Sequence, residues 1–154
     1  MGVYRNRRNL YDDQIKAIGE KNGVIGVTAF GPMVKLLTSN DDKAYLEDML
    51  DHFDYVIDMI GAKYVGIGLD VGWKRTMGEA GHHLMSLAFS ANEMLLDSGP
   101  YTYSLHNWYV EELKAASNWP KITEGLVARG YSDDEILKIL GGNFMRVFKA
   151  VWDK

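Results

Sequence analysis

Two short apolar runs on either side of one long amphipathic segment constrain the fold of this chain more than any other feature. The runs are residues 24–30 (VIGVTAF) and residues 64–69 (YVGIGL). Their length and their bounding glycines are typical of strands that are covered on both faces. Between them, residues 41–60 carry apolar side chains at three- and four-residue spacing, which predicts a helix with one apolar face. The order strand, helix, strand predicts a βαβ unit with parallel strands.

Shorter helical patterns lie on both sides of this unit. Residues 12–21 form one pattern, and residues 119–152 contain three more. Helix termini are predicted from capping and stop residues. These are Asn22-Gly23 after residues 12–21, Ser39, Asn40 or Asp41 before the helix at 41–60, Gly61 after it, Gly130 after the first C-terminal helix, Ser132 with Glu135 at the start of the second, Gly141-Gly142 at its end, and Asn143 as the cap of the last.

Two buried strands are too few for a self-sufficient parallel sheet. Their outer edges need partners, and an α/β domain of 154 residues normally has more strands. Either residues 71–118 contain further strands, or a second segment or chain completes the sheet. The aromatic residues of the middle segment could line a pocket or form an oligomer contact. They are Trp73, Tyr101, Tyr103, Trp108 and Tyr109.

Composition excludes several classes of site. The net charge is −4, which argues against nucleic acid as a partner because phosphate binding needs a basic face. The chain has no cysteine, so disulfides, thiolate catalysis and zinc–thiolate sites are excluded. A cysteine-free chain fits a cytoplasmic location. No apolar run approaches the length of a membrane span, so no membrane partner is expected.

Three segments, in order, resemble the renal (membrane) dipeptidase family, peptidase family M19. They are RRNLYDDQIKAIGEKNGVIGVTAF, YVGIGLD and ARGYSDDEILKILGGNFMRVF. The resemblance covers residues 7–70 and about 119–152, whereas residues 71–118 lack it. It implies an α/β fold, namely the C-terminal part of a (β/α)₈ barrel with its last two parallel strands and the flanking and C-terminal helices. Residues 1–154 would then be one partial domain.

The resemblance also implies an activity. The complete family enzyme holds two zinc ions and hydrolyses dipeptides or related small amides with metal-activated water. The family's metal ligands are an early His-x-Asp, a bridging glutamate and two later histidines, and all of them are expected upstream of this chain. By itself the chain is therefore expected to bind no zinc and to be inactive. Its expected partner is the missing N-terminal barrel portion or a second copy, as in a homo-oligomer.

Asp70 is the predicted catalytic residue. A carboxylate at the C-terminal end of a barrel strand points into the active-site mouth. The resemblance implies that Asp70 shuttles a proton between the activated water and the leaving amine. The alternative is an aspartate that only caps the following turn with Gly72. Better-known family members carry a second Asp-Gly just after this position, whereas here residues 71–73 are VGW.

Arg8 is the predicted substrate-binding residue. In the family, the arginine directly before the asparagine of this motif binds the substrate's C-terminal carboxylate. The planar guanidinium group suits that role because it makes two parallel charge-assisted bonds. The alternative is a solvated surface arginine, which is also the expectation for Arg5 and Arg7.

Histidines provide the remaining candidates. His82 and His83, with Glu79 and His106 near them in sequence, could hold a metal together with Asp70, although adjacent histidines diverge. His52 lies beside the apolar face of the predicted helix at 41–60 and is expected to be a structural histidine. A non-enzymatic alternative stays open for the whole chain: an α/β module that oligomerises through its strand edges and binds a ligand or partner.

Overall fold

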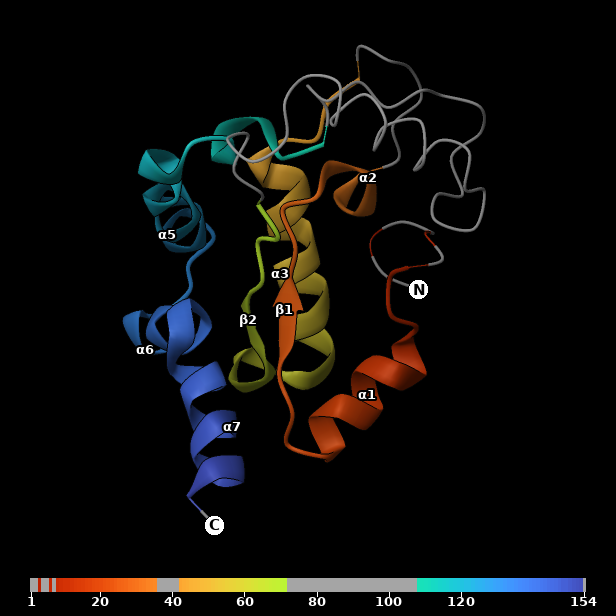
Figure 1. Ribbon diagram of the computed structural model, residues 1–154, viewed down its shortest axis with the longest axis vertical. Coiled ribbons are helices and arrows are strands. Elements are labelled where there is room, and N and C mark those ends of the chain that lie inside the picture. Colours follow the sequence, from red (N-terminus) through yellow and green to blue (C-terminus); the bar gives the residue numbers. More distant parts are fainter. Residues whose placement is uncertain (1–2, 4–5, 7, 36–41, 72–107, 154) are drawn as a thin grey trace.

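A parallel pair of strands and the helix that connects them form the centre of the structure, a computed structural model that describes residues 3, 6, 8–35, 42–71 and 108–153. Strand β1 (Ile25–Val27) pairs with strand β2 (Val65–Ile67), with Gly26 opposite Gly66. Helix α3 (Leu46–Ile60) runs behind both strands (Figure 1). The predicted βαβ unit with parallel strands is therefore confirmed.

The other helices flank this unit on two sides (Figure 1). Helix α1 packs against α3 on one side, and α5 packs against α3 on the other. The chain then descends along the second side through α6 and α7 (Figure 1). The bounds are α1 (Asp12–Glu20), α2 (Gly31–Val34), η1 (Ala62–Tyr64), η3 (Glu111–Leu113), η4 (Ala116–Asn118), α5 (Pro120–Ala128), α6 (Asp133–Leu137), the π-helical turn η5 (Lys138–Gly142) and α7 (Asn143–Trp152).

Strand β1 is shorter than the apolar run that predicted it. The regular pairing with β2 ends at Val27. Beyond it, the backbone of Ala29 forms hydrogen bonds with two different segments. The Ala29 N–H donates to Leu69 O at 3.0 Å, and the Ala29 carbonyl accepts from the Val110 N–H at 2.9 Å. Phe30 and Tyr109 form an isolated antiparallel bridge. Residues 109 and 110, which belong to the segment 71–118, thus pair with the chain that continues from β1. The sequence left open whether this segment contributes strand contacts.

Helix α3 begins at Leu46, so the predicted start near residue 41 was wrong. Two carboxylates satisfy its first backbone donors. The Tyr45 N–H donates to Asp48 Oδ2 at 2.8 Å, and the Leu46 N–H donates to Glu112 Oε2 at 2.9 Å. Negative charge at this end also suits the helix dipole. The predicted caps at residues 39–41 lie outside the described residues.

The predicted helix stops at Gly61 and at Asn22 are confirmed. Gly61 follows α3 with φ of 94°, and Asn22 follows α1 with φ of 58°. Both values lie in the left-handed region that commonly ends a helix. Ser132 and Glu135 form the predicted capping box at the start of α6.

The predicted helix stop at residues 141–142 is confirmed as a kink. Gly141 has non-helical backbone angles, φ of 168° and ψ of −20°, and this break separates the helix that starts at α6 and continues through η5 from α7. Asn143, however, does not cap α7. Its side chain is buried, and its Nδ2 donates to Ala62 O and Val65 O, both at 2.7 Å.

Helix α7 is fastened to the amino-terminal ends of both strands. The Arg146 guanidinium donates to Asn22 O at 2.6 Å, Gly23 O at 2.8 Å and Lys63 O at 3.0 Å. Phe144 lies over the glycines of the sheet, since a Cβ on Gly66 would come within 2.5 Å of its ring. The amino-terminal ends of the strands are thereby covered.

The core lies mainly along α3. Met49, Leu50 and Phe53 have no exposed surface, and Leu113 and Leu126 reach them from the C-terminal half. Within the described parts of the chain, no strand pairs with the outer edge of β1 or of β2. The same parts hold no helix whose length and hydropathy would let it cross a bilayer.

Candidate functional site

Asp70 lies just beyond the carboxyl end of β2, where the chain leaves the sheet. Leu69 still contacts β1 through its carbonyl, as described above, but Asp70 has φ of 54° and an exposed side chain. Aspartate is one of the few residues that tolerates this left-handed conformation. The structure therefore places the carboxylate at the end of the strand that the sequence predicted. The predicted proton transfer stays a prediction.

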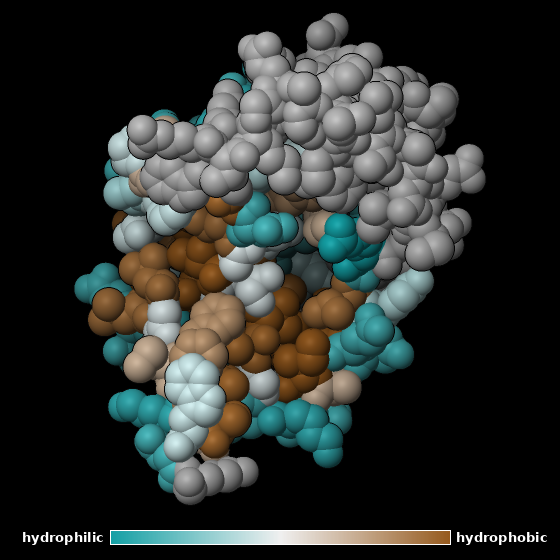
Figure 2. All heavy atoms as spheres, in the orientation of Figure 1, coloured by the Kyte–Doolittle hydropathy of each residue, from teal (hydrophilic) through white to brown (hydrophobic). Residues whose placement is uncertain are grey.

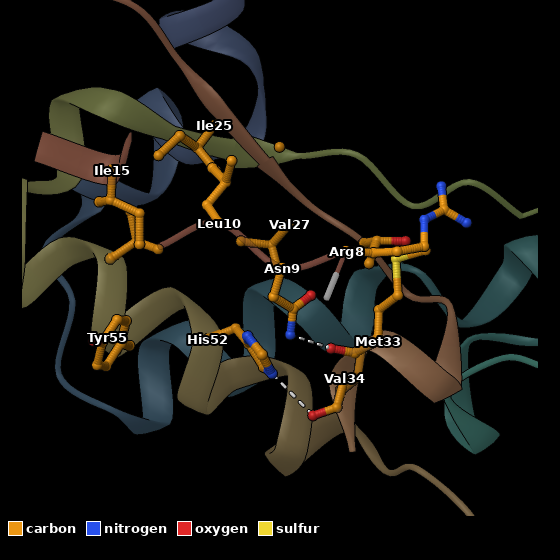
Figure 3. Close-up of a pocket in the computed structure, with 13 residues that line it drawn as sticks. Arg8, Asn9, Leu10, Ile15, Ile25, Val27, Met33, Val34, His52 and Tyr55 are labelled. Atoms are coloured by element: carbon orange, nitrogen blue, oxygen red, sulfur yellow. Dashed lines mark hydrogen bonds between the residues drawn. The ribbon is translucent and has the colours of Figure 1, made fainter. Parts of the chain in front are cut away.

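Arg8 lies in a turn that is held by its neighbours. Its backbone N–H donates to Asn6 Oδ1 at 2.9 Å, and the Asn9 N–H donates to Asn6 O at 3.0 Å. Arg8 itself is exposed, whereas Asn6 is 2% exposed. In Figure 3 the guanidinium group extends away from His52 and Asn9.

A cavity of about 210 Å³ lies between α1, β1 and α3, with Arg8 at one side (Figure 3). Most of its walls are apolar, from Leu10 and Ile15 to Val27 and Val56. Asp70 does not line it. The structure therefore does not bring Arg8 and Asp70 together in one pocket.

His52 donates a hydrogen bond at one wall of this cavity. Its Nε2 lies 2.9 Å from Val34 O. Because the carbonyl can only accept, Nε2 carries the proton. Burial lowers the pKa of His52 below its usual value of 6.5. This is the structural histidine that the sequence predicted.

The lowered pKa of His52 predicts a loss of stability in mild acid. The unfolded chain takes up the proton more readily than the folded chain, so the free energy of unfolding should fall as pH drops below about 6.5. Urea unfolding at pH 7.5 and 5.5 measures this fall. His52→Gln, whose amide can still donate to Val34 O, should show a smaller fall between the same two pH values. An equal fall in both proteins would contradict the assignment to His52.

The described residues do not fit a metal centre. They contain no group of three or more histidine, aspartate or glutamate side chains that could hold a metal ion. His82, His83, His106 and Glu79 lie outside the described residues, so the alternative of a metal site built from them stays untested. Trp73, Tyr101 and Tyr103 lie outside them as well. Trp108 is buried and packs edge-on against Phe30, with ring centroids 6.1 Å apart.

A charged cluster fastens α5 to α3 and was missed at the sequence level. Arg129 pairs with Glu47 at 2.7 Å, with Asp51 at 2.8 Å and with Asp54. The Tyr131 hydroxyl donates to Asp54 at 2.5 Å, and burial together with Asp54 raises the pKa of Tyr131. The spacing of the three acids (i, i+4, i+7) places them on one helix face and could have revealed the cluster. It is a structural contact, remote from Asp70 in the sequence.

The α/β fold, with its two parallel strands and flanking helices, matches a portion of solved TIM-barrel structures. An amidohydrolase from Pseudomonas aeruginosa superposes with a TM-score of 0.68 and 24% identity, covering 96% of this chain and 42% of that one. A metallopeptidase from Rhodobacter sphaeroides, bound to a phosphinate mimic of the dipeptide L-Ala-D-Ala, superposes with a TM-score of 0.59 and 21% identity. That match covers 94% of this chain and 32% of that one.

The sequence identifies the family within this fold. The family model for membrane dipeptidases, peptidase family M19, matches residues 1–84 and 102–153, so the chain belongs to this family. Dipeptidase aclJ of Aspergillus oryzae is 25% identical over 144 residues, which are 94% of this chain and 26% of the relative. The chain thus spans between about a quarter and two fifths of the length of these matched proteins. At the sequence level the resemblance was placed in residues 7–70 and about 119–152, which was too narrow. The family match also includes most of the segment between them and leaves out only residues 85–101 there.

Proposed function

We propose that this chain is the C-terminal portion of a dipeptidase barrel, with β1 and β2 as its last two strands. The complete enzyme hydrolyses dipeptides or related small amides. The observation that carries the proposal is the polarity of the βαβ unit. Asp70 stands exposed at the carboxyl end of β2, where barrel enzymes place their catalytic groups, while α7 covers the opposite end.

Asp70 and Arg8 have distinct proposed roles. The Asp70 carboxylate accepts a proton and returns it to the leaving amine. The Arg8 guanidinium binds the C-terminal carboxylate of the dipeptide through two parallel bonds. In the complete enzyme, two zinc ions supply the activated water. We assign the metal ligands to the remainder of the barrel, as the resemblance to the family implies.

Exposed strand edges and apolar surfaces of this chain are consistent with the proposal that further parts of a barrel pack against it. The outer edges of β1 and β2 lack strand partners among the described residues. An apolar cavity lies beside β1, and Figure 2 shows apolar side chains at the surface between α1 and α7. Phe148 and Trp152 stack on α7 with centroids 4.7 Å apart, and Trp152 is 72% exposed. Further strands and helices of a barrel would cover these surfaces.

The same surfaces favour a second candidate, an α/β module that associates with another copy of itself. Exposed strand edges and aromatic side chains both promote association. Size-exclusion chromatography with light scattering separates the two candidates. A discrete dimer without any dipeptidase activity, even when the barrel is completed, would favour the module.

A chimaera tests the proposed activity. Residues 1–154 are joined to the part of the Pseudomonas aeruginosa amidohydrolase that they do not match, and hydrolysis of alanyl-alanine is measured with zinc. We expect activity in the chimaera and none in the chain alone. Asp70→Asn in the chimaera should lower kcat by about 100-fold or more, as for the loss of a general acid–base group.

Asp153→Asn is the matched control, because Asp153 is an exposed carboxylate beyond the end of α7. It should leave kcat unchanged. Two results would contradict the proposal. One is tight binding of two zinc ions with dipeptide cleavage by residues 1–154 alone, and the other is full activity of a folded Asp70→Asn chimaera.

A further inference from the structure

The backbone of Arg8 is fixed by the side chain of a buried asparagine. Asn6 uses both ends of its amide group. Its Oδ1 accepts the Arg8 N–H at 2.9 Å, and its Nδ2 donates to Pro32 O at 2.9 Å. With the main-chain bond from the Asn9 N–H to Asn6 O, Asn6 is hydrogen-bonded to both Arg8 and Asn9, as in an Asx-type turn. The turn is therefore joined to α2 as well as closed on itself.

A second amide anchors the other side of the turn. Asn9 Nδ2 donates to Met33 O at 3.0 Å, and His52 Nε2 donates to Val34 O at 2.9 Å. Three consecutive carbonyls at the end of α2 thus each receive a side-chain donor. The last carbonyls of any helix lack partners within the helix. In this chain Asn6 and Asn9 bind two of these carbonyls and thereby attach the turn to α2. Figure 3 shows the bonds from Asn9 to Met33 O and from His52 to Val34 O.

Arg8 and Asn6, the residue that binds its backbone, differ in solvent exposure. Asn6 is almost completely removed from solvent, whereas Arg8 is exposed. A buried polar side chain is kept only when its hydrogen bonds are made, and both ends of the Asn6 amide make them. The arrangement gives an exposed cation a rigid backbone. A rigid backbone reduces the entropy that is lost when the guanidinium binds a planar anion.

We propose that Asn6 and Asn9 are positioning residues for Arg8, orienting its guanidinium toward the C-terminal carboxylate of a dipeptide. This inference rests on the proposed role of Arg8 as the carboxylate clamp. Asn6 touches no substrate and acts through the Arg8 backbone. Asn9 acts through the attachment of the turn to α2.

The test uses the ¹⁵N-labelled full chain and two probes, alanyl-alanine and its C-terminal amide. NMR titration gives the affinity of each probe, and the difference between them reports carboxylate recognition. In the wild-type chain we expect carboxylate-dependent shifts at the Arg8 backbone and Nε–H signals. Arg8→Ala should abolish the difference between the two probes.

Two variants of Asn6 separate positioning from stability. Asn6→Ala and Asn6→Ser both lose the bond to Pro32 O, but the serine hydroxyl can still accept the Arg8 N–H. We expect similar urea midpoints for the two variants. Asn6→Ala should weaken the carboxylate-dependent affinity roughly three- to tenfold, the effect of one freed side chain, and Asn6→Ser should restore part of it. Asn118→Ala, a change remote from the turn in the sequence, should leave the affinity unchanged.

The outcomes distinguish this inference from the proposed function. Equal affinities for the two probes in the wild-type chain, or an Arg8→Ala chain that binds like the wild type, would overturn the role of Arg8 and the inference with it. If Arg8→Ala loses recognition while Asn6→Ala and Asn6→Ser bind equally well, the clamp stands and the positioning role is wrong.

Discussion

Gly66→Ala should lower the free energy of unfolding by about 2–3 kcal/mol, the usual cost of overpacking a filled site. The added Cβ would lie 2.5 Å from Cε2 and 2.9 Å from Cδ2 of Phe144. The same ring also lies over Gly26, where an added Cβ would lie 3.4 Å from its Cζ. The ring must therefore shift to admit the methyl group. Urea unfolding followed by circular dichroism measures the loss.

A double-mutant cycle with Phe144→Ala is the control for this prediction. When the ring is absent, the methyl group of Gly66→Ala should fit, and its cost should fall below about 1 kcal/mol. The coupling energy between the two positions should then exceed about 1 kcal/mol, as expected for residues in direct contact. An equal cost of Gly66→Ala in both backgrounds would show that the ring does not set the requirement for glycine.

Helix α7 contacts the two strands at their centre and near their amino-terminal ends. Phe144 lies over the central glycines Gly26 and Gly66, and Arg146 binds backbone carbonyls of the residues that precede β1 and β2. Asp70 lies at the other end. Among the described residues, α7 is thus bound near the amino-terminal ends of the strands, whereas the candidate catalytic carboxylate lies just beyond the carboxyl end of β2.

The βαβ unit was predictable because its signals are local. Alternating or continuous apolar runs, the spacing within α3 and the stop at Gly61 are all contained in short stretches of sequence. Only half of the cap at the start of α3 is local. Asp48 binds the Tyr45 N–H from three residues away, but Glu112 binds the Leu46 N–H across 66 positions. No short window of sequence contains both residues.

The candidate site residues Asp70 and Arg8 could be predicted from the sequence, but the residues that hold the Arg8 backbone in place could not. Asp70 interrupts an apolar run, and Arg8 precedes the asparagine of a recognisable motif, so both stood out in the sequence. Asn6 did not, because an asparagine near the start of a chain is usually an exposed turn residue. Its burial depends on the carbonyl of Pro32, 26 positions away. The sequence carries no periodic signal for such a contact.

Asn143→Ala should lower the free energy of unfolding by about 3 kcal/mol. Its Nδ2 satisfies the carbonyls of Ala62 and Val65, and the side chain is 2% exposed. Alanine would leave these carbonyls without that donor in a buried site, and each such loss costs about 1–3 kcal/mol. The substitution would also remove the side-chain contact that joins the start of α7 to η1 and the start of β2. Urea unfolding at pH 8 measures the loss, and Asn118→Ala, a half-buried asparagine on η4, should change stability by less than about 0.5 kcal/mol.

Asn143→Asp shows whether the donor or the shape of the side chain matters. Aspartate has the same shape, but its ionised form only accepts hydrogen bonds and would face two carbonyl oxygens. At pH 8 it should therefore destabilise the chain more than alanine does. Burial raises the pKa of such a carboxyl group, and its protonated form can donate one bond. The difference between Asn143→Asp and Asn143→Ala should consequently narrow at pH 5. An Asn143→Asp chain as stable as the wild type at pH 8 would mean that shape alone holds α7 against β2, and the hydrogen bonds would lose the role assigned to them.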